Sequence, residues 1–377
     1  MEKDISENKK KRIEELDIAK GLGMLYVVAF HFLDYSSELA YICLNAVSVV
    51  FIMIVYFLVS GYTFRSGKTP WQNIKKRIPA LLKPFVIYTV IITLLFLLIL
   101  TIMGAADMSE YGTDLYYLFA GKGIVDMISP GTFTENLSMI PAEPYWFLKQ
   151  MMLASILFYL LADFVLKSNM NLLIVQVLLF GSSVLMSALC PQLPLDIEVT
   201  PAIAGYMLMG AWCGKNRVAE KFRDKVFHPI FIIAAVISAV ISVLMCTYFS
   251  PGEGLARGYF STEVTHGLDV MTTLLTSVFS IVPFWWICLL IGKTNIIRKV
   301  ISWLGENSLS IYLIHMFIGM SIMMIAGIDA VLYDEEIPYQ TIIFIAVFAA
   351  TLALSCLYAV IRNRIIKAFL TRKKKNQ

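Results

Sequence analysis

Ten long runs of apolar residues constrain the fold of this chain more than any other feature. Hydrophobic residues make up 58% of its 377 positions and charged residues only 15%, which is more apolar material than one soluble core can bury. Each run is roughly long enough to cross a hydrocarbon core ~30 Å thick, and none alternates as the strands of a membrane β-barrel do. Because open strands leave backbone groups unsatisfied in lipid, the pattern predicts an all-α polytopic membrane protein of ten transmembrane helices. The predicted spans are 20–37, 41–63, 84–104, 146–166, 171–189, 199–214, 229–249, 269–291, 307–327 and 340–362.

The Lys and Arg residues fall almost entirely on one side of this arrangement. When both termini are placed in the cytoplasm, 28 of the 31 basic residues lie on the inner side, and only Lys122, Lys149 and Arg257 lie outside. Positive charge accumulates on cytoplasmic loops, so this asymmetry favours ten spans with both termini cytoplasmic. No basic face is interleaved with aromatic residues, so no nucleic-acid partner is predicted. The predicted organisation is a cytoplasmic segment at 1–19, one transmembrane domain at 20–362 and a basic cytoplasmic tail at 363–377.

The first apolar segment carries two ionisable residues, Lys20 and His31, eleven positions apart. Eleven residues of helix come within about 20° of three full turns, so both side chains lie on one face, roughly 16 Å apart along the axis. An ionisable group inside the bilayer costs about 3 kcal/mol, and such groups usually mark a functional site. The pair therefore predicts a cation at the membrane edge and a functional imidazole within the membrane. This first span and the short, Gly-containing sixth span (199–214) are typical of helices that line a cavity.

The longest predicted outer loop, roughly 105–145, is rich in acidic and aromatic residues, and Glu143 and Trp146 stand at its end. Carboxylates accept hydrogen bonds from hydroxyls and aromatic faces stack on sugar rings, so this composition suits a polyol or sugar. Glu143 and Trp146 are therefore candidate substrate contacts. The alternative is a solvated loop, with Trp146 as an anchor at the membrane interface.

Five short strings occur in order along the chain: RIEELDIAK at 12–20 followed by His31, FLVSGY at 57–62, KRIPALLKP at 76–84, YWFL at 145–148 and LGENSLSIYLIH at 304–315. Together they resemble the integral-membrane acyltransferase-3 family, in particular its sugar O-acetylase branch, over essentially the whole chain. The resemblance implies about ten spans in a cell membrane, most simply a bacterial plasma membrane. It also implies transfer of an acyl group, commonly acetyl or succinyl, from cytoplasmic acyl-CoA to a hydroxyl of a cell-envelope sugar.

This chemistry gives the ionisable residues of the first span a role. An alcohol needs a positioned base to attack a thioester at neutral pH, and imidazole is the usual choice, so His31 is the predicted general base. The alternative is a core histidine bonded to a neighbouring helix. Lys20 stands where many family members carry Arg; it keeps the positive charge for a phosphate or thioester carbonyl but lacks the bidentate fork. Asp34 is a candidate to orient the imidazole or bind acceptor hydroxyls, unless it is an ordinary helix-end residue.

The ninth span carries a second imidazole, that of His315. Ser308 is a plausible N-cap, which places His315 about 10 Å along the helix and within the bilayer. His315 is predicted either to act in catalysis, by stabilising the oxyanion or orienting His31, or to bridge helices. Glu306 lies near the inner end of the same helix, where a carboxylate in the first turn complements the helix dipole.

Lys75, Lys76 and Arg77 match the family's basic stretch and, with Lys20, are predicted to contact the phosphates of acyl-CoA, most simply acetyl-CoA. The alternative is that the positive-inside rule alone places them at the cytoplasmic mouth. The six cysteines are scattered singly and show no zinc, haem or redox spacing, so no metal site is predicted. Gly61, in the string Ser60-Gly61-Tyr62, is predicted to serve helix packing, and Ser60 is not expected to carry the acyl group.

Two other classes of function stay open at this point. A polytopic transporter or exporter of a glycan or small polar solute also has many spans and a polar interior, although no internal repeat relates the two halves of the chain. A membrane sensor that has kept the scaffold and lost the chemistry is the third possibility. The presence of both Lys20 and His31 weighs against it.

Overall fold

The computed structural model describes residues 12–33, 49–102, 104, 145–189, 193–249, 266–328 and 340–375, and these ranges contain helices and no strand. The helices are α1 (Glu14–Leu33), α3 (Val49–Tyr62), α4 (Pro70–Ile102), α7 (Trp146–Val165), α8 (Asn169–Leu189), the 3-10 helix η3 (Pro194–Val199), α9 (Thr200–Lys215), α10 (Val218–Arg223), α11 (Pro229–Phe249), α12 (His266–Gly292), α13 (Ile296–Glu306), α14 (Ser308–Tyr312), α15 (His315–Ile325) and α17 (Gln340–Lys375).

Six helical stretches are long and apolar enough to cross a membrane: Pro70–Ile102, Trp146–Val165, Asn169–Leu189, Leu274–Gly292, Ser308–Ile325 and Ile342–Ala368. This finding confirms an all-α, multi-pass membrane protein. Two shorter apolar helices, Ile52–Tyr62 and Pro229–Met245, coincide with other predicted spans. The total of ten spans and the orientation of the termini stay predictions.

Several helices extend beyond the apolar segments that predict them. The helix α1 begins at Glu14, inside the predicted N-terminal segment, and acidic residues in its first turn complement the helix dipole. The helix α4 begins at Pro70, where Thr69 and Gln72 bond to each other's backbone amides in a capping box. The helix α17 continues to Lys375 through most of the predicted tail. Hydropathy therefore locates the part of a helix that lies in lipid and not the ends of that helix.

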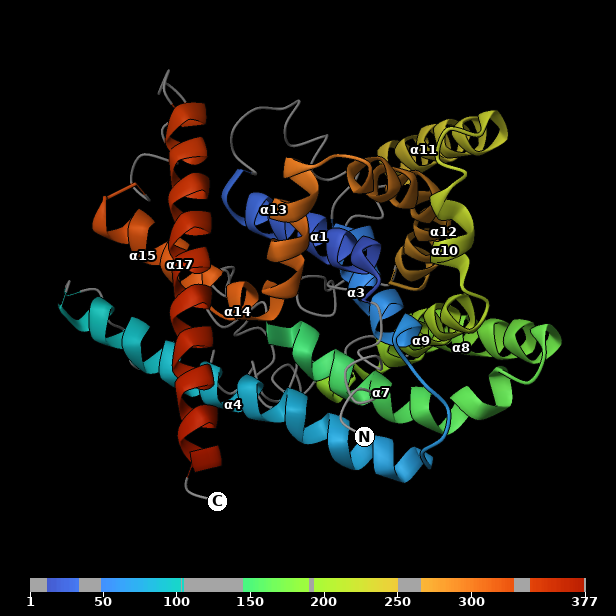
Figure 1. The fold of residues 1–377 in the computed structure, drawn as a ribbon, viewed down its shortest axis with the longest axis horizontal. Coiled ribbons are helices and arrows are strands. Elements are labelled where there is room, and N and C mark those ends of the chain that lie inside the picture. The colour runs from blue at the N-terminus through green and yellow to red at the C-terminus, as the bar shows by residue number, and fades with distance from the viewer. Residues whose placement is uncertain are drawn as a thin grey trace, which may run out of the picture.

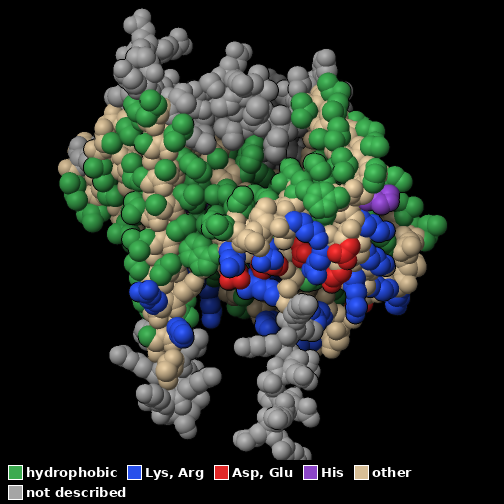
Figure 2. Space-filling model, turned by 45° about the horizontal axis from the view of Figure 1, so that its top comes forward, with side chains coloured by type: hydrophobic (Ala, Val, Ile, Leu, Met, Phe, Trp, Pro, Cys, Tyr) green, Lys and Arg blue, Asp and Glu red, His purple; other side chains and the backbone are tan. Residues whose placement is uncertain are grey.

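The helices form an inner group covered by an outer one (Figure 1). The helices α1, α3 and α9 bury most of their side chains, and α1 packs against α13 while α3 packs against α9. The outer helices expose large apolar residues, such as Leu94 on α4, Val177 on α8 and Ile230 on α11. Figure 2 shows this apolar surface above a belt where Lys, Arg, Asp and Glu side chains gather. An apolar girdle bounded by a charged belt is what a bilayer and its edge require.

Close contacts between backbones hold the inner helices together. A Cβ atom added to Gly61 of α3 would lie 1.8 Å from the carbonyl oxygen of Met207 on α9, and one added to Gly210 would lie 2.0 Å from that of Leu58. The α1–α13 crossing is equally tight, since a Cβ at Gly305 would lie 1.8 Å from the Asp17 carbonyl oxygen. Small residues let helices approach closely where lipid supplies no hydrophobic driving force. The predicted packing role of Gly61 is confirmed.

The predicted span 307–327 corresponds to the apolar stretch Ser308–Ile325, but the helix is interrupted within it. The segment divides into α14 and α15, with the non-helical turn at Leu313 and Ile314. Asn307, and not Ser308, is the N-cap residue of α14, and it makes no side-chain capping bond. Glu306 is likewise not in the first turn of this helix, because it is the last residue of α13.

Candidate active site

The two membrane histidines lie side by side. His31, near the end of α1, and His315, the first residue of α15, have ring centroids 5.5 Å apart and ring planes inclined by 42°. His315 is fully buried, whereas His31 is only partly buried. The structure thus brings two predicted site residues, 284 positions apart in the sequence, into one imidazole pair.

The proton arrangement on His315 follows from its partner. Its Nδ1 lies 2.8 Å from the backbone carbonyl oxygen of Tyr312. A carbonyl only accepts, so in the neutral ring Nδ1 carries the hydrogen and Nε2 is left as an acceptor. Nε2 is buried and makes no hydrogen bond within the described part of the chain. His315 therefore offers an acceptor lone pair in the membrane interior beside His31.

Residues at the start of α7 contact the break between α14 and α15 and stabilise it. The hydroxyl of Tyr145 donates to the carbonyl oxygen of Leu313, one of the backbone groups that the interrupted helix leaves open. The ring of Phe147 packs edge-on against the ring of Tyr312. The centroid of the Tyr312 ring lies 5.9 Å from that of the His315 ring. Sequence reasoning did not identify Tyr145 or Tyr312 as site residues. Both occur in the family-like strings, which was the available signal.

A close contact between α1 and α15 sets the spacing of the imidazole pair. A Cβ atom added to Gly319 of α15 would lie 1.9 Å from Cζ of Phe32, the residue next to His31. Phe32 is only 1% exposed, so its ring has little room to retreat.

Gly319→Ala is therefore expected to push α15 away from α1 and to lower any activity that depends on the imidazole pair about 100-fold, since misplacement by about 1 Å can cost that much. Turnover and melting temperature in detergent measure the effect. The double variant Gly319→Ala, Phe32→Leu, which makes room for the new methyl group, should recover most of the turnover. Full activity of the single variant would show that the spacing does not matter.

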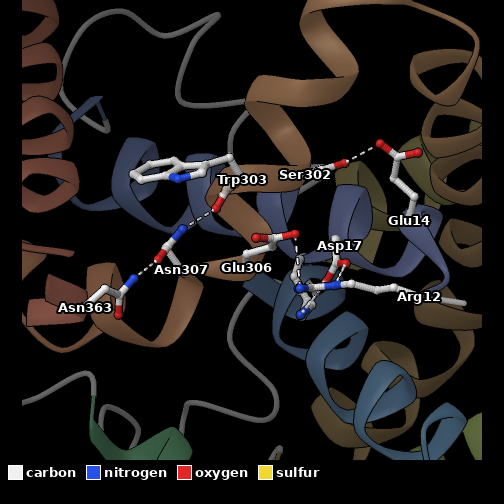
Figure 3. Close-up of polar contacts among 9 residues, drawn as sticks. Arg12, Glu14, Asp17, Ser302, Trp303, Glu306, Asn307 and Asn363 are labelled. Atoms are coloured by element: carbon white, nitrogen blue, oxygen red, sulfur yellow. Dashed lines mark hydrogen bonds and ion pairs between the residues drawn. The ribbon is translucent and has the colours of Figure 1, made fainter. Parts of the chain in front are cut away.

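Lys20 lies in a network of charges at the other end of α1. Its Nζ is 2.8 Å from Asp17 Oδ1, and Asp17 also accepts from Arg12 (Figure 3). Arg12 in turn pairs with Glu306 of α13 at 3.1 Å. Lys20 and His31 are thus on one unbroken helix but about three turns apart, and they do not meet. The predicted catalytic cation belongs to a charged cluster near the start of α1.

The same region joins α1, α13, α14 and α17 through further hydrogen bonds (Figure 3). Ser302 of α13 donates to Glu14 of α1 at 3.5 Å. Asn363 of α17 donates to the side-chain oxygen of Asn307 at 2.7 Å, and Asn307 donates to the Trp303 carbonyl oxygen. These bonds fix the ends of α13 and α14 against α1 and α17.

The three basic residues of α4 that are predicted to contact phosphate differ in exposure and in their partners. Lys75 and Lys76 are exposed, and Lys75 lies over the ring of Trp71, 5.3 Å from its centroid. Arg77 is partly buried and donates from Nη2 to Ser60 Oγ at 2.9 Å. No ion pair of Arg77 occurs among the described residues, and its buried Nε donates no hydrogen bond there. Arg77 is therefore a partly buried cation with donor capacity left for an anion.

The predicted acceptor contacts are only partly visible. Asp34 and Glu143 lie outside the described residues. Trp146 is the first residue of α7 and packs, partly buried, against the core, with its ring edge-on to Phe147 at 6.3 Å.

A buried ion pair, which sequence reasoning did not identify, lies one turn into α7. Lys149 Nζ is 2.8 Å from Asp196 Oδ2, and both side chains are 3% exposed. Gln150 donates to the carbonyl oxygens of Leu195 and Asp196 and accepts from Thr200. Leu195 and Asp196 adopt left-handed backbone conformations, with φ of 62° and 54°, which are unusual for side chains of this kind. Their strained turn aims Asp196 at Lys149 and ties η3 to α7.

Glu198, in the same 3-10 helix, is buried, and burial above all raises its pKa from 4.5 to about 7. Because the folded-state pKa exceeds the unfolded one, the folded protein loses stability as pH rises from about 4.5 to 7, by up to about 3 kcal/mol.

Glu198→Gln should remove this dependence. Its melting temperature should match the wild type at pH 4.5 and exceed it at pH 8, as thermal unfolding in detergent would measure. Identical pH profiles of the two proteins would show that Glu198 ionises freely in the folded state.

The fold and this interior site define a multi-pass membrane protein with a paired imidazole between its helices. The family model described as an acyltransferase domain, that of the acyltransferase-3 family, matches residues 13–360, and the chain belongs to this family. The protein is accordingly a membrane acyltransferase of the O-acyltransferase type, which transfers groups other than aminoacyl groups. No curated protein and no solved structure matches the chain. The family resemblance is thus confirmed and favours an enzyme over a transporter, while the sugar O-acetylase branch stays a prediction.

Proposed function

We propose that the protein moves an acyl group, in the first place acetyl, from cytoplasmic acyl-CoA to a hydroxyl of an extracytoplasmic or lipid-linked sugar. The observation that carries the proposal is the imidazole pair of His31 and His315, because it supplies a base within the membrane between the two compartments. The more accessible of the two rings, His31, is the base.

The reaction is a direct transfer. His31 accepts the proton of the acceptor hydroxyl while the hydroxyl oxygen attacks the thioester carbonyl carbon. The tetrahedral intermediate then collapses, the carbon–sulfur bond breaks, and the thiolate of CoA leaves and takes the proton from His31. The products are the ester and free CoA, and His31 is again neutral.

His315 acts on His31 and not on the oxyanion in this scheme. Its Nδ1 hydrogen is engaged by the Tyr312 carbonyl, so a neutral His315 has no ring hydrogen left to donate. Its Nε2 lone pair instead suits the imidazolium that forms on His31, as the carboxylate of a hydrolase triad suits its histidine. His315 is thus a positioning residue whose acceptor stabilises the charged form of the base.

The phosphates of the donor are proposed to lie at the inner end of the helices. Arg77 supports this placement because it is partly buried, forms no ion pair among the described residues and keeps donor capacity. Lys20, Lys75 and Lys76 add positive charge on the same predicted side. The long pantetheine arm of CoA then carries the thioester along α1 toward His31. Asp34, Glu143 and Trp146 are proposed to contact the acceptor on the outer side.

The test measures donor consumption and acceptor modification together. Membranes that contain the wild-type chain are incubated with acetyl-CoA, and free CoA thiol is followed over time. Envelope glycans from cells with and without the protein are compared by mass spectrometry. The proposal expects thiol release that depends on the protein and a glycan mass increase of one acyl group. If acetyl-CoA is not consumed and the glycan masses are unchanged, the proposal is wrong.

A further inference from the structure

An apolar cavity of about 230 Å³ lies between α1, α3, α9, α10, α11 and α12. Its walls are apolar surfaces, including those of Val59, Phe222 and Trp285. An engineered cavity of about 150 Å³ stays dry and holds benzene, so this one has room for a stretch of hydrocarbon. The sixth predicted span, which corresponds to α9, lines it as expected, whereas α1 contributes Leu16 and Ala19, which precede the first predicted span.

A second, polar cavity of about 510 Å³ lies between α1, α10, α12 and α13. This volume is within the range of pockets that bind small molecules. Its lining includes four cations and three carboxylates, which leaves a net charge of +1. The cations are Arg12, Arg223, Lys293 and Arg298.

The two cavities adjoin. Tyr62, in the wall of the apolar cavity, donates a 2.7 Å hydrogen bond to Glu220, in the wall of the polar one. The short helix α10 serves both, since Ala219 and Phe222 line the apolar cavity while Glu220 and Arg223 line the polar one.

The cavities are also stacked along the predicted membrane normal. Around the start of α1 the polar lining runs from Arg12 to Ile18 and overlaps the apolar lining (Leu16 and Ala19), but it begins four residues earlier, so the polar cavity extends nearer the start of α1. On α12 the apolar lining (Ile281 to Trp285) precedes the polar lining (Leu289 to Lys293), so the polar cavity lies nearer the end of α12. Both of these helix ends are predicted to be cytoplasmic. The polar cavity is thus at the inner edge and the apolar one deeper, as in a lipid of the inner leaflet.

Two of the cations have donor capacity to spare. The Nε of Arg298 is 3.5 Å from Glu14 and donates no hydrogen bond within the described residues. Among the described residues, the ion pair of Lys293 is a long contact of 4.0 Å to Asp224. By contrast, Arg223 makes a two-bond ion pair with Glu15, so a phosphate would have to compete with that carboxylate. Arg298 and Lys293 are therefore the groups that suit a phosphate.

We infer that the stacked cavities bind one anionic phospholipid of the cytoplasmic leaflet, with its phosphate at Arg298 and Lys293 and part of an acyl chain in the apolar cavity. The occupant is not the acyl group that the enzyme transfers. From Ala19, in the cavity wall, to His31 the helix rises about 18 Å, so a chain in this cavity does not bring a thioester to the base. The lipid site goes beyond the proposed function and does not depend on it.

Native mass spectrometry of the full chain in detergent tests this site. The probes are phosphatidylglycerol and phosphatidylcholine with the same acyl chains, each titrated alone and against palmitoyl-CoA. We expect phosphatidylglycerol to bind at least about tenfold more tightly than phosphatidylcholine, and the double variant Arg298→Gln, Lys293→Gln to lose about tenfold of that affinity. The cavity-filling variant Val282→Phe should weaken binding of both lipids.

Matched controls separate the site from general effects. Lys299→Gln removes an exposed charge next to Arg298, and Val278→Phe enlarges a side chain that is 49% exposed one turn away on α12; both should bind as the wild type does. Size-exclusion profiles identify any variant that fails to fold, and the head and chain variants are independent of each other. Equal affinity for the two lipids, or wild-type binding by both test variants, would overturn the inference. Displacement of the lipid by palmitoyl-CoA, with CoA binding weakened by Val282→Phe, would overturn it in favour of the donor.

Discussion

His31→Gln is expected to lower acyl transfer by about 10²- to 10⁴-fold, the usual contribution of a general base, with little loss of folded protein. Glutamine occupies similar space and makes hydrogen bonds but cannot accept a proton at neutral pH. His31 is partly buried at the end of α1 and contacts the rings of Phe30, Phe32 and His315, none of which requires a charge on it. Release of CoA thiol and glycan acylation, measured as above, quantify the loss.

The control for this variant is His228→Gln. His228 is an exposed residue between α10 and α11, and its replacement removes the same group far from the imidazole pair in the sequence. It should leave transfer unchanged. Normal acyl transfer by His31→Gln, at wild-type expression, would remove His31 from the mechanism and with it the proposed base.

His315→Gln distinguishes the two histidines. If His315 stabilises the imidazolium of His31, its loss should move the limb of the pH–rate profile that follows ionisation of the base to lower pH, as well as slow turnover. A purely structural His315 would lower the amount of folded enzyme without moving the pH profile of the remainder. The pH profile of kcat is therefore the informative measurement for this residue.

The sequence predicted the helices well because lipid imposes a simple rule on them. Each predicted span overlaps a helix of the structure, since a backbone in hydrocarbon must satisfy its own hydrogen bonds. The ends were less predictable. Residues such as Glu14 and Lys375 are polar, so they carry no hydropathy signal, yet each is the terminal residue of its helix.

Both imidazoles of the candidate site were named from the sequence, but their contact was not. His31 and His315 were both identified, and the structure places them together. The helix break that aligns His315 had no sequence signal, because the segment from Ser308 to His315 contains neither Pro nor Gly. The bond from Tyr145 to Leu313 that supports the break joins residues 168 positions apart, and a contact of this kind comes from tertiary packing alone.

The contrast between Lys20 and Arg77 shows how charge alone can mislead. Both are basic residues on the predicted cytoplasmic side, and from the sequence they are equivalent candidates for a phosphate. In the structure Lys20 already has a carboxylate partner in Asp17, whereas Arg77 bonds to a serine hydroxyl. A phosphate must compete with Asp17 for Lys20 but not with any described carboxylate for Arg77. The partners of a cation, which only the fold determines, decide whether it is available to a ligand.

The packing of α3 against α9 carries the second large effect. Gly61→Ala is expected to destabilise the protein by about 3 kcal/mol or more, because the new methyl group would lie 1.8 Å from a carbonyl oxygen and 2.7 Å from its carbon. A flexible side chain can rotate out of such a contact, but a helix backbone cannot, so the two helices must separate. Gly210 and Gly214 lie on the facing helix in the same crossing and are similarly close to the α3 backbone. The helices therefore cannot relieve the clash by sliding along each other.

The matched control is Gly181→Ala on α8, where no neighbouring atom lies within 4 Å of the added Cβ. This exposed helical glycine should gain up to about 1 kcal/mol, as alanine is the better helix former. Thermal unfolding in detergent and the yield of monodisperse protein compare the two variants. If Gly61→Ala proved as stable as Gly181→Ala, the two helices would have to be farther apart than described here. In that case the apolar cavity between α1, α3 and α9, whose walls include Gly210, would also be larger than about 230 Å³.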